Sequence, residues 1–278
     1  MRSMRELITL STDYLEKRGV AHPRREAEEL LAHLLNKKRL ELYFDYDAPL
    51  QEKEVTAYRE RIKRKGDKEP LAYILGEMPF LELTLKVTKD VLIPRHETEI
   101  LADLVSKQLG DASIHIWDLC CGSGCLGLSI KRRHPQAEVT LSDVSKEALA
   151  VAKENASLNH LDVTFLEGDL LAPFSGKADV ILCNPPYVTE EEYETLEDEV
   201  RLFEPKLALV GGTDFYARLE WELPPYLNDN AKLFFEIGAG QKEALEELFK
   251  ASHWTQKRCE KDWSGNDRFF FLEYRKGF

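Results

Sequence analysis

The chain has 278 residues, of which 43% are hydrophobic and 32% are charged, with 15 Gly and 12 Pro. This is an ordinary globular composition, and it excludes a disordered chain, a collagen-like repeat and a small disulfide-bonded scaffold. The formal net charge of −12 argues against wholesale wrapping of nucleic acid, because phosphate binding needs clustered Lys and Arg. The acidity is uneven: residues 1–80 carry 16 basic and 15 acidic side chains, whereas residues 81–278 carry 22 and 35.

The N-terminal residues contain no apolar run of signal-peptide length, and no stretch of 18 apolar residues occurs in the chain. We therefore expect no membrane association and a cytoplasmic protein. Five cysteines are too few for a disulfide framework in a chain of this length. Three of them, Cys120, Cys121 and Cys125, lie in one glycine-containing segment, which suits a reducing compartment.

Apolar residues in the first 80 positions recur at helical spacing, in stretches that begin near Leu7, Arg24 and Val55. This pattern predicts a small all-α domain over residues 1–78. Residues 80–87 alternate instead, residues 88–90 are turn formers, and residues 91–94 are apolar again. That change predicts a β-hairpin linker over residues 79–93.

From about residue 97, short apolar runs alternate with helical stretches, as in βαβ units on a parallel sheet. The expected strands are Ile114–Leu119, Glu138–Ser142, Val163–Glu167, Val180–Cys183, Lys232–Ile237, Gln256–Glu260 and Phe269–Tyr274, and the expected helices are 97–108, 124–133, 145–157, 214–227 and 240–251. The connection between the last two strands is too short for a crossover helix, so they should pair antiparallel. The sequence therefore predicts an α/β, doubly wound, seven-stranded domain over residues 94–278.

A glycine-rich loop follows the first of these strands. Gly122, Gly124 and Gly127 satisfy G-x-G-x-x-G, in which glycines allow a tight turn and a close approach of the backbone to a ligand. Asp143 ends the next strand, where a carboxylate can accept hydrogen bonds from two ribose hydroxyls. Asp169 follows the third strand, at the same edge of the sheet. A turn with helix-capping acids is the plain alternative to a cofactor site.

Two kinds of cofactor fit this loop. A nicotinamide dinucleotide places a pyrophosphate there, and an acidic side chain just before the loop does not help it. Asp118 stands four residues before Gly122, which favours a cationic ligand. S-adenosylmethionine carries an ammonium and a sulfonium and no phosphate, so the acidic surroundings favour it.

The fourth strand runs into Asn184-Pro185-Pro186-Tyr187, the most specific signal in the chain. Two prolines fix the backbone and remove two donors, so carbonyl oxygens remain as acceptors. With the Asn184 side-chain oxygen and the aromatic face of Tyr187, this set suits a planar –NH₂ group. Holding both hydrogens on acceptors can aim the nitrogen lone pair at a methyl group, so positioning supplies much of the acceleration.

The chain resembles the HemK/PrmC family of release-factor glutamine N5-methyltransferases over nearly its full length. Besides the glycine loop and the tetrapeptide, the resemblance rests on Pro70–Gly76, Leu92–Glu99, Arg201–Pro205, Ala208-Leu209, Gly211-Gly212, Glu236–Gly238 and Asp262…Gly265…Arg268. It implies a Rossmann-like, seven-stranded methyltransferase sheet and a helical N-terminal domain that helps to hold the release factor. It also implies methylation of the glutamine in the Gly-Gly-Gln loop of class 1 release factors, with S-adenosyl-L-homocysteine as the other product.

The same resemblance implies the roles of the site residues. The cofactor-binding set is Asp118, Cys120, Cys121, Gly122, Ser123, Gly124, Asp143, Asp169, Leu170 and Asn184, with Leu170 beside the adenine. Asn184 and Pro185 would accept the glutamine amide hydrogens, and Tyr187 would pack on the plane of the amide, so Asn184, Pro185 and Tyr187 are the catalytic residues and Pro186 completes the substrate site. We expect no metal and a monomer.

Two departures from the family pattern stand out, Cys120 where glycine is common and His96 where a second proline is usual. We expect a slightly different loop at Cys120 and no catalytic role for His96. Cys120, Cys121, Cys125 and Cys183 could converge, yet their spacing matches no zinc site, and we expect small buried residues around the cofactor. The acidic run over residues 190–199 is either a solvated helix or a surface for a basic partner.

Three other functions compete with glutamine methylation. An N-methyltransferase acting on an exocyclic amine of nucleic acid would use the same tetrapeptide, but the acidity of residues 81–278 and the family-specific segments argue against it. A nicotinamide-dependent oxidoreductase rests on the glycine pattern alone. A non-catalytic binding module would leave the tetrapeptide without a role.

Overall fold

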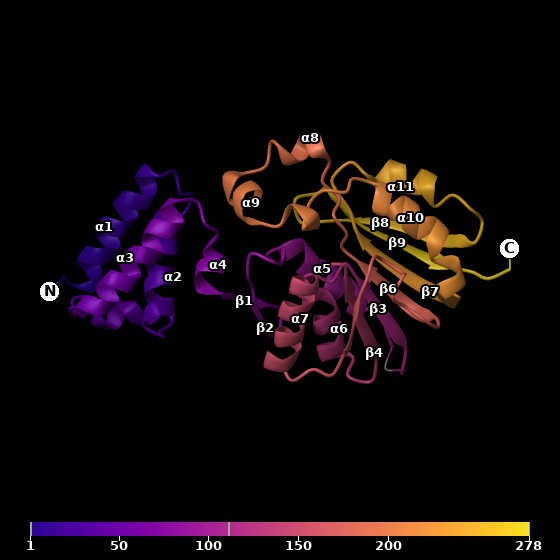
Figure 1. Ribbon diagram of the computed structural model, residues 1–278, viewed down its shortest axis with the longest axis horizontal. Coiled ribbons are helices and arrows are strands. Elements are labelled where there is room, and N and C mark those ends of the chain that lie inside the picture. Colours follow the sequence, from indigo (N-terminus) through magenta and orange to yellow (C-terminus); the bar gives the residue numbers. More distant parts are fainter. Residues whose placement is uncertain (1, 111, 278) are drawn as a thin grey trace. The chain divides into compact units, whose positions relative to one another are not determined.

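The computed structural model describes residues 2–110 and 112–277. The chain forms two compact units (Figure 1). A helical unit comprises Met1–Glu77 together with Glu197–Phe203, and a sheet unit comprises Met78–Leu196 together with Glu204–Phe278. In the described ranges, no helix has both the length and the apolar character that a membrane span requires.

The helical unit has its own hydrophobic core. Its elements are α1 (Met4–Lys17), α2 (Pro23–Leu34), the 3₁₀ helix η1 (Arg39–Asp45), α3 (Glu52–Gly66), α4 (Leu71–Leu75) and α9 (Asp198–Phe203). Ser3 caps α1 through a reciprocal capping box with Glu6, and Pro23 occupies the first position of α2, where its missing N–H costs no helical hydrogen bond. The helices meet through buried apolar side chains such as Leu30 and Tyr58. The apolar spacing of the first 80 residues thus predicted helices where the structure has them.

A buried cation holds α9 in the helical unit. The Lys65 side chain is 2% exposed, and its Nζ lies 3.1 Å from Glu26 Oε2 and 2.7 Å from Glu199 Oε1. Burial raises the pKa of Glu26, although the nearby ammonium opposes that rise. The acidic run over residues 190–199 is therefore not one helix: α8 (Glu190–Tyr193) belongs to the sheet unit, while Glu199 is an internal ion-pair partner in the helical unit.

A β-hairpin opens the sheet unit, but its turn is not where the sequence placed it. The two strands are β1 (Glu77–Phe80) and β2 (Leu83–Lys86), so the turn lies at Leu81 and Glu82 instead of residues 88–90. Leu81 adopts a left-handed conformation with φ of 48°, which permits the tight reversal. Residues 91–94, expected as the second arm, form no strand, and Val91, Leu92 and Pro94 line the cavity described below.

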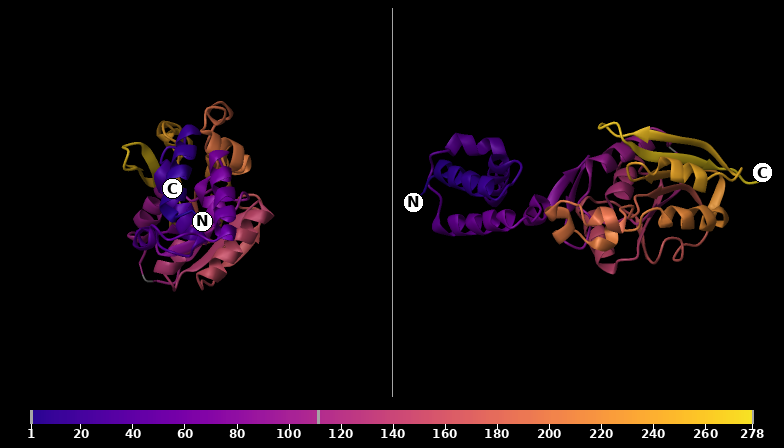
Figure 2. Two further views of the ribbon diagram at one scale, coloured as in Figure 1. Left: turned by 90° about the vertical axis from the view of Figure 1, so that its left-hand side faces the viewer. Right: turned by 90° about the horizontal axis from the view of Figure 1, so that it is seen from above.

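The main sheet has seven strands in the order β5-β4-β3-β6-β7-β9-β8. They are β3 (His115–Leu119), β4 (Glu138–Asp143), β5 (Thr164–Glu167), β6 (Ala178–Cys183), β7 (Leu227–Glu236), β8 (Trp254–Lys261) and β9 (Asp267–Tyr274). The first five are parallel, and β9 runs antiparallel to both β7 and β8. Figure 2 shows this final pair, in yellow, at one edge of the sheet. The predicted seven-stranded α/β fold with a reversed final hairpin is confirmed.

Helices cover both faces of the sheet. Alternating strand residues such as Ile116 and Leu141 pack against α5 (His96–Ser106), α6 (Cys125–Arg133) and α7 (Lys146–Leu158). Their neighbours along the strands pack against α10 (Asp214–Glu222) and α11 (Lys242–Leu248).

The helix expected over residues 214–227 is too long. Helix α10 ends at Glu222, and Pro224–Tyr226 form a short 3₁₀ helix. Two successive prolines at 224 and 225 lack the N–H groups that would continue the α-helix.

The contact between Gly127 of α6 and Asp118 of β3 predicts a stability effect. A Cβ at Gly127 would lie 2.8 Å from Asp118 Oδ2 and 3.2 Å from Leu141 Cγ. Gly127→Ala should therefore lower the free energy of unfolding by about 1–3 kcal/mol, measured by urea denaturation. The matched control is Gly110→Ala, because a Cβ at Gly110 meets nothing within 4 Å. Equal stability of the two variants would contradict this account of the packing.

Candidate active site

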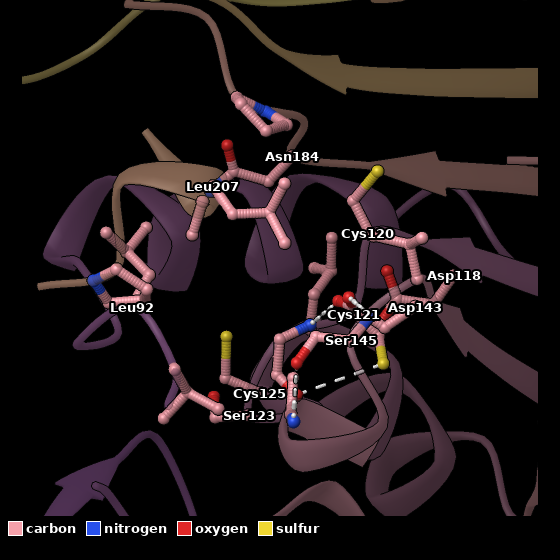
Figure 3. A pocket seen from close by; sticks show the side chains of 18 of the residues that line it. Leu92, Asp118, Cys120, Cys121, Ser123, Cys125, Asp143, Ser145, Asn184 and Leu207 are labelled. Carbon is pink, nitrogen blue, oxygen red and sulfur yellow. Dashed lines mark hydrogen bonds between the residues drawn. The ribbon is translucent and has the colours of Figure 1, made fainter. Parts of the chain in front are cut away.

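A cavity of about 1020 Å³, counted out to its open mouth, lies at the carboxyl edge of the parallel strands. Residues that follow β3, β4, β5 and β6 line it, because parallel strands bring their carboxyl ends to one edge. In the view of Figure 3, Asp118, Asp143 and Ser145 gather on one side of the cavity, with Leu92 on the opposite side. Of the residues predicted for the site, the cavity is lined by Asp118, Cys120, Cys121, Gly122, Ser123, Asp143, Asp169, Leu170, Asn184 and Pro186.

Gly124, Pro185 and Tyr187 are the predicted site residues that do not line the cavity. Gly124 precedes α6 in a left-handed conformation with φ of 80°, and a Cβ there would lie 3.0 Å from a Leu141 methyl group. Its role in the structure is to make the turn. Pro185 is buried, and Tyr187 is half-buried against the apolar side chains that pack under α10 and α11.

The glycine loop keeps its turn despite the cysteine at position 120. Cys120 has a φ of 56°, the left-handed conformation that glycine adopts most readily. Buried Asn155 supports the loop from α7, because its Nδ2 donates to the Ser123 carbonyl at 2.9 Å. The departure from glycine therefore leaves a side chain in a conformation that costs about 1 kcal/mol, and that side chain faces the cavity.

Asp118 is a buried carboxylate, and one backbone hydrogen bond is its main compensation for the loss of solvation. It is 1% exposed, and its Oδ2 accepts a hydrogen bond of 2.8 Å from the Gly127 N–H. Burial, with a smaller contribution from the charge of Asp143, raises its pKa to about 7, and the Gly127 N–H opposes the rise. A cation in the cavity would stabilise the ionised form of this group.

Asp143 lies at the end of β4, and both of its carboxylate oxygens face the loop backbone. Oδ2 accepts from the Gly122 N–H at 2.8 Å and Oδ1 accepts from the Ser145 N–H at 2.9 Å. Burial raises its pKa, and these N–H groups oppose the rise. Each oxygen keeps a second lone pair, so the carboxylate can also accept two hydroxyl hydrogens.

The third strand contributes Asp169 and Leu170 to the cavity wall. Leu170 is buried and has a φ of 45°, so the backbone turns sharply there. The Asp169 carboxylate pairs with the Arg218 guanidinium at 3.0 Å and is half exposed. Leu170 thus offers an apolar surface to the cavity, and Asp169 lines the cavity while its carboxylate is paired with Arg218.

The tetrapeptide is held from three sides. Gln241 Nε2 donates to the Tyr187 carbonyl at 2.8 Å, and a Cβ at Gly211 would lie 2.4 Å from the Pro186 carbonyl oxygen. The Tyr187 hydroxyl donates to Glu236 Oε1 at 3.3 Å, and burial raises the pKa of that hydroxyl. Asn184, the first residue after β6, is thereby placed at the cavity wall on a rigid turn.

Sequence reasoning missed the rim of the cavity. The rim comes from residues within the segments 90–98 and 205–208. The Glu204 carboxylate links the two segments: it accepts a hydrogen bond from the Arg95 guanidinium at 2.6 Å and one from the Ile93 N–H at 3.0 Å. The sequence pattern assigned residues 91–94 to a hairpin and residues 97–108 to a helix, and nothing in the spacing indicated that this segment meets residues 205–208. His96, by contrast, lies as expected at the start of α5, paired with Glu99 at 2.7 Å and packed against Trp263.

The cysteines converge around the cavity. Cys120, Cys121 and Cys125 line it, and the Cys183 thiol is buried beside Cys120. All are free thiols, and burial raises the pKa of Cys125 to about 12. Among the described residues, no group of three or more His, Cys, Asp or Glu side chains has the arrangement of a metal site.

Two family models match the chain, the PrmC N-terminal domain over residues 6–76 and the methyltransferase small domain over residues 96–204. A release factor glutamine methyltransferase of Chlamydia trachomatis is 42% identical over 97% of this chain and 94% of its own length. The chain belongs to the release factor glutamine methyltransferase family. A further relative of the same name from Geobacter sulfurreducens is 36% identical over 96% of this chain and 95% of its own.

Solved structures agree with the methyltransferase fold. A Thermus thermophilus 16S rRNA N2 G1207 methyltransferase, in complex with AdoMet and guanosine, superposes with a TM-score of 0.54 at 19% identity, covering 72% of this chain and 50% of its own. A methyltransferase from Pyrococcus furiosus has a TM-score of 0.53 at 16% identity, over 70% and 90% of the two chains. The predicted Rossmann-like methyltransferase sheet is confirmed.

The charge around the cavity of this methyltransferase is acidic. Its lining carboxylates are Asp90, Asp118, Asp143 and Asp169, and the cation among the described lining residues, Arg95, is paired with Glu204. A dinucleotide pyrophosphate would meet carboxylates here without a free cation. The geometry therefore opposes the nicotinamide alternative, as the family assignment also does.

The pKa of Asp118 predicts a pH-dependent stability effect. The ionised form destabilises the fold, and this cost grows as the pH rises from the ordinary value of 3.8 toward about 7. Asp118→Asn should raise the melting temperature more at about pH 8 than at about pH 5.5, by roughly 2–4 °C for each kcal/mol relieved. Differential scanning fluorimetry of the ligand-free protein measures this. The exposed Asp162→Asn is the control, and a gain at low pH alone would contradict the assignment.

Proposed function

We propose that this protein transfers a methyl group from S-adenosyl-L-methionine to the side-chain amide nitrogen, N5, of the glutamine in the Gly-Gly-Gln motif of class 1 release factors. The placement of the Asn184 amide at the wall of an acidic cavity, on a turn fixed by two prolines, carries the proposal. The names of the relatives that match nearly the whole chain support the choice of substrate.

The residues around the cavity fit S-adenosylmethionine. Buried Asp118 lacks a cationic partner among its hydrogen bonds, and the ammonium of the methionine moiety would supply one. Asp143 would accept the ribose hydroxyls, and the buried Leu170 would contact the adenine. Cys120, Cys121, Gly122 and Ser123 would contact the cofactor along the loop, with Gly124 making its turn.

The protein's own contribution is positioning. The cofactor would supply an electrophilic methyl group: as the bond from the glutamine nitrogen to this methyl forms, the sulfur–methyl bond would break. S-adenosyl-L-homocysteine would leave, and the methylated nitrogen would lose one proton to solvent. The Asn184 side-chain oxygen and the Pro185 carbonyl would accept the two amide hydrogens and turn the nitrogen lone pair toward the cavity. Tyr187 would pack against the amide plane, with its hydroxyl anchored on Glu236. Alignment of this kind accounts for a large part of the barrier reduction in a displacement reaction.

The helical unit would serve to dock the release factor. Its match to the PrmC N-terminal domain over residues 6–76 supports this role, as does its separate core. We place the docking domain at residues 1–78, the linker at 79–93 and the catalytic domain at 94–278. The protein would act as a monomer in the cytoplasm, where release factors act.

A nucleic-acid amine is the competing substrate, and labelled methyl transfer separates the two. With labelled cofactor, we expect label in an unmethylated class 1 release factor and none in ribosomal RNA or DNA. A release factor whose Gly-Gly-Gln glutamine is replaced by alanine is the control substrate. Label in RNA or DNA, with none in the release factor, would overturn the proposal.

Asn184→Ala tests the role of the tetrapeptide. Loss of the acceptor should lower kcat by about 10²–10³-fold, since the interaction is made to the reacting group. The dissociation constant of S-adenosylmethionine, measured by calorimetry, should change little. Wild-type turnover in Asn184→Ala would refute the role. Asn228→Ala, on β7 at the other end of the sheet, controls for the loss of an asparagine.

The cavity cysteines give a second readout of cofactor binding. Saturating S-adenosylmethionine should slow alkylation of Cys120, Cys121 and Cys125 by iodoacetamide, because these side chains line the cavity. Cys259 on β8 lies outside it and is the internal control. The reaction is followed by peptide mass spectrometry over hours at about pH 8.5, because burial raises the pKa of Cys125 to about 12 and only the minor thiolate fraction reacts. Equal rates with and without cofactor would place the ligand elsewhere.

A further inference from the structure

The orientation of the Asn184 amide decides whether the proposed function works. A side-chain amide presents an oxygen acceptor on one side and an NH₂ donor on the other. Only the oxygen can accept a hydrogen from a substrate –NH₂ group, whereas the flipped amide would present hydrogens to hydrogens. Some part of the protein must therefore fix which way Asn184 points.

A chain of hydrogen bonds leads from Asn184 into the sheet unit. Asn184 Nδ2 donates to Thr98 Oγ1 at 3.3 Å, and Thr98 Oγ1 donates to Glu236 Oε2 at 2.7 Å. Thr98, on α5, is 2% exposed, and Glu236, the last residue of β7, is 1% exposed. Cys183 pairs with Phe235 in the parallel register, so Asn184 and Glu236 are the next residues on neighbouring strands.

The direction of this chain follows from the chemistry of its members. An ionised Glu236 carboxylate can only accept, so the single hydroxyl hydrogen of Thr98 points to it. Thr98 Oγ1 then has only lone pairs to offer, and Asn184 must turn its NH₂ group toward it. The Asn184 oxygen is left facing away from Thr98, available to a substrate.

We propose that Thr98 and Glu236 are positioning residues that fix the Asn184 amide with its oxygen toward the substrate. This proposal rests on the proposed function and extends it to two residues that do not themselves contact the reacting atoms. Protonated Glu236 can donate to Thr98, whose hydroxyl can then donate to the Asn184 oxygen, and the orientation is lost.

The surroundings of Glu236 bring the pKa of its carboxyl close to neutral pH. Burial raises its pKa to about 7, while the bond from Thr98, the Arg268 charge and the Tyr187 hydroxyl oppose the rise. The charged or titratable groups that face it are Glu97 on α5, Cys125 on α6, Tyr187 after β6, Tyr216 on α10 and Arg268 on β9. Activity should therefore increase as the pH rises through about 7, as Glu236 ionises.

Three variants test the proposal, with release factor as substrate and saturating S-adenosylmethionine. Thr98→Val should lower kcat by about 10–100-fold, and Thr98→Ser should restore it to within a few-fold of wild type. Glu236→Gln should lower kcat similarly and abolish the acid limb of its pH profile. The exposed Thr164→Val on β5 is the matched control. The S-adenosylmethionine dissociation constant should remain near wild type throughout.

A readout without turnover keeps the proposal separate from the proposed function. The ¹⁵N-labelled side-chain amide of Asn184, assigned by its loss in Asn184→Asp, should shift with a midpoint near pH 7 in wild type and not in Thr98→Val or Glu236→Gln. Should Thr98→Val fail to fold, Thr98→Ser and Glu236→Gln carry the test. A folded Thr98→Val with wild-type kcat, and with an Asn184 resonance that still shifts with a midpoint near pH 7, would overturn the proposal. If the resonance behaves as expected but no release factor is methylated, the proposed function fails and the positioning role stands.

Discussion

The parallel register of five strands is the constraint on which the site depends. It brings the ends of β3, β4, β5 and β6 to one edge of the sheet. The groups that meet there are the carboxylates of Asp118 and Asp143, the apolar turn at Leu170 and the amide of Asn184. None of these groups is near another in the sequence. Their convergence follows from backbone hydrogen bonding between the strands, together with helices packed on both faces.

Two buried carboxylates at this edge, Asp118 and Glu236, have few hydrogen-bond partners, and these partners differ in kind. Asp118 receives one backbone N–H and faces the glycine loop, so a cation satisfies it. Glu236 receives the hydroxyls of Thr98 and Tyr187, so its charge orients neighbouring side chains. Burial raises the pKa of both groups to about 7. In the proposed mechanism, the two buried charges would serve separate tasks, cofactor recognition for Asp118 and alignment of the substrate for Glu236.

Much of this arrangement could be predicted from the sequence. Apolar periodicity gave the sheet strands to within a few residues, and the strand-loop-helix context placed Asp118, Asp143 and Asn184 at one edge. The wrong predictions, of the hairpin turn and of the end of α10, each trace to one or two residues. Leu81 adopts a left-handed turn that its side chain does not signal, and Pro224 ends α10 early. The contact of Glu204 with Arg95 spans more than a hundred residues, and no local pattern encodes it.

The central claim is that the Asn184 amide presents an acceptor to the side-chain amide of a protein glutamine. Fragmentation mass spectrometry of a class 1 release factor, after incubation with this protein and S-adenosylmethionine, tests it most directly. The account predicts a single added methyl group on the side-chain nitrogen of the Gly-Gly-Gln glutamine. A methyl group on another residue of the factor, or an unmodified factor while the cofactor is consumed, would contradict it.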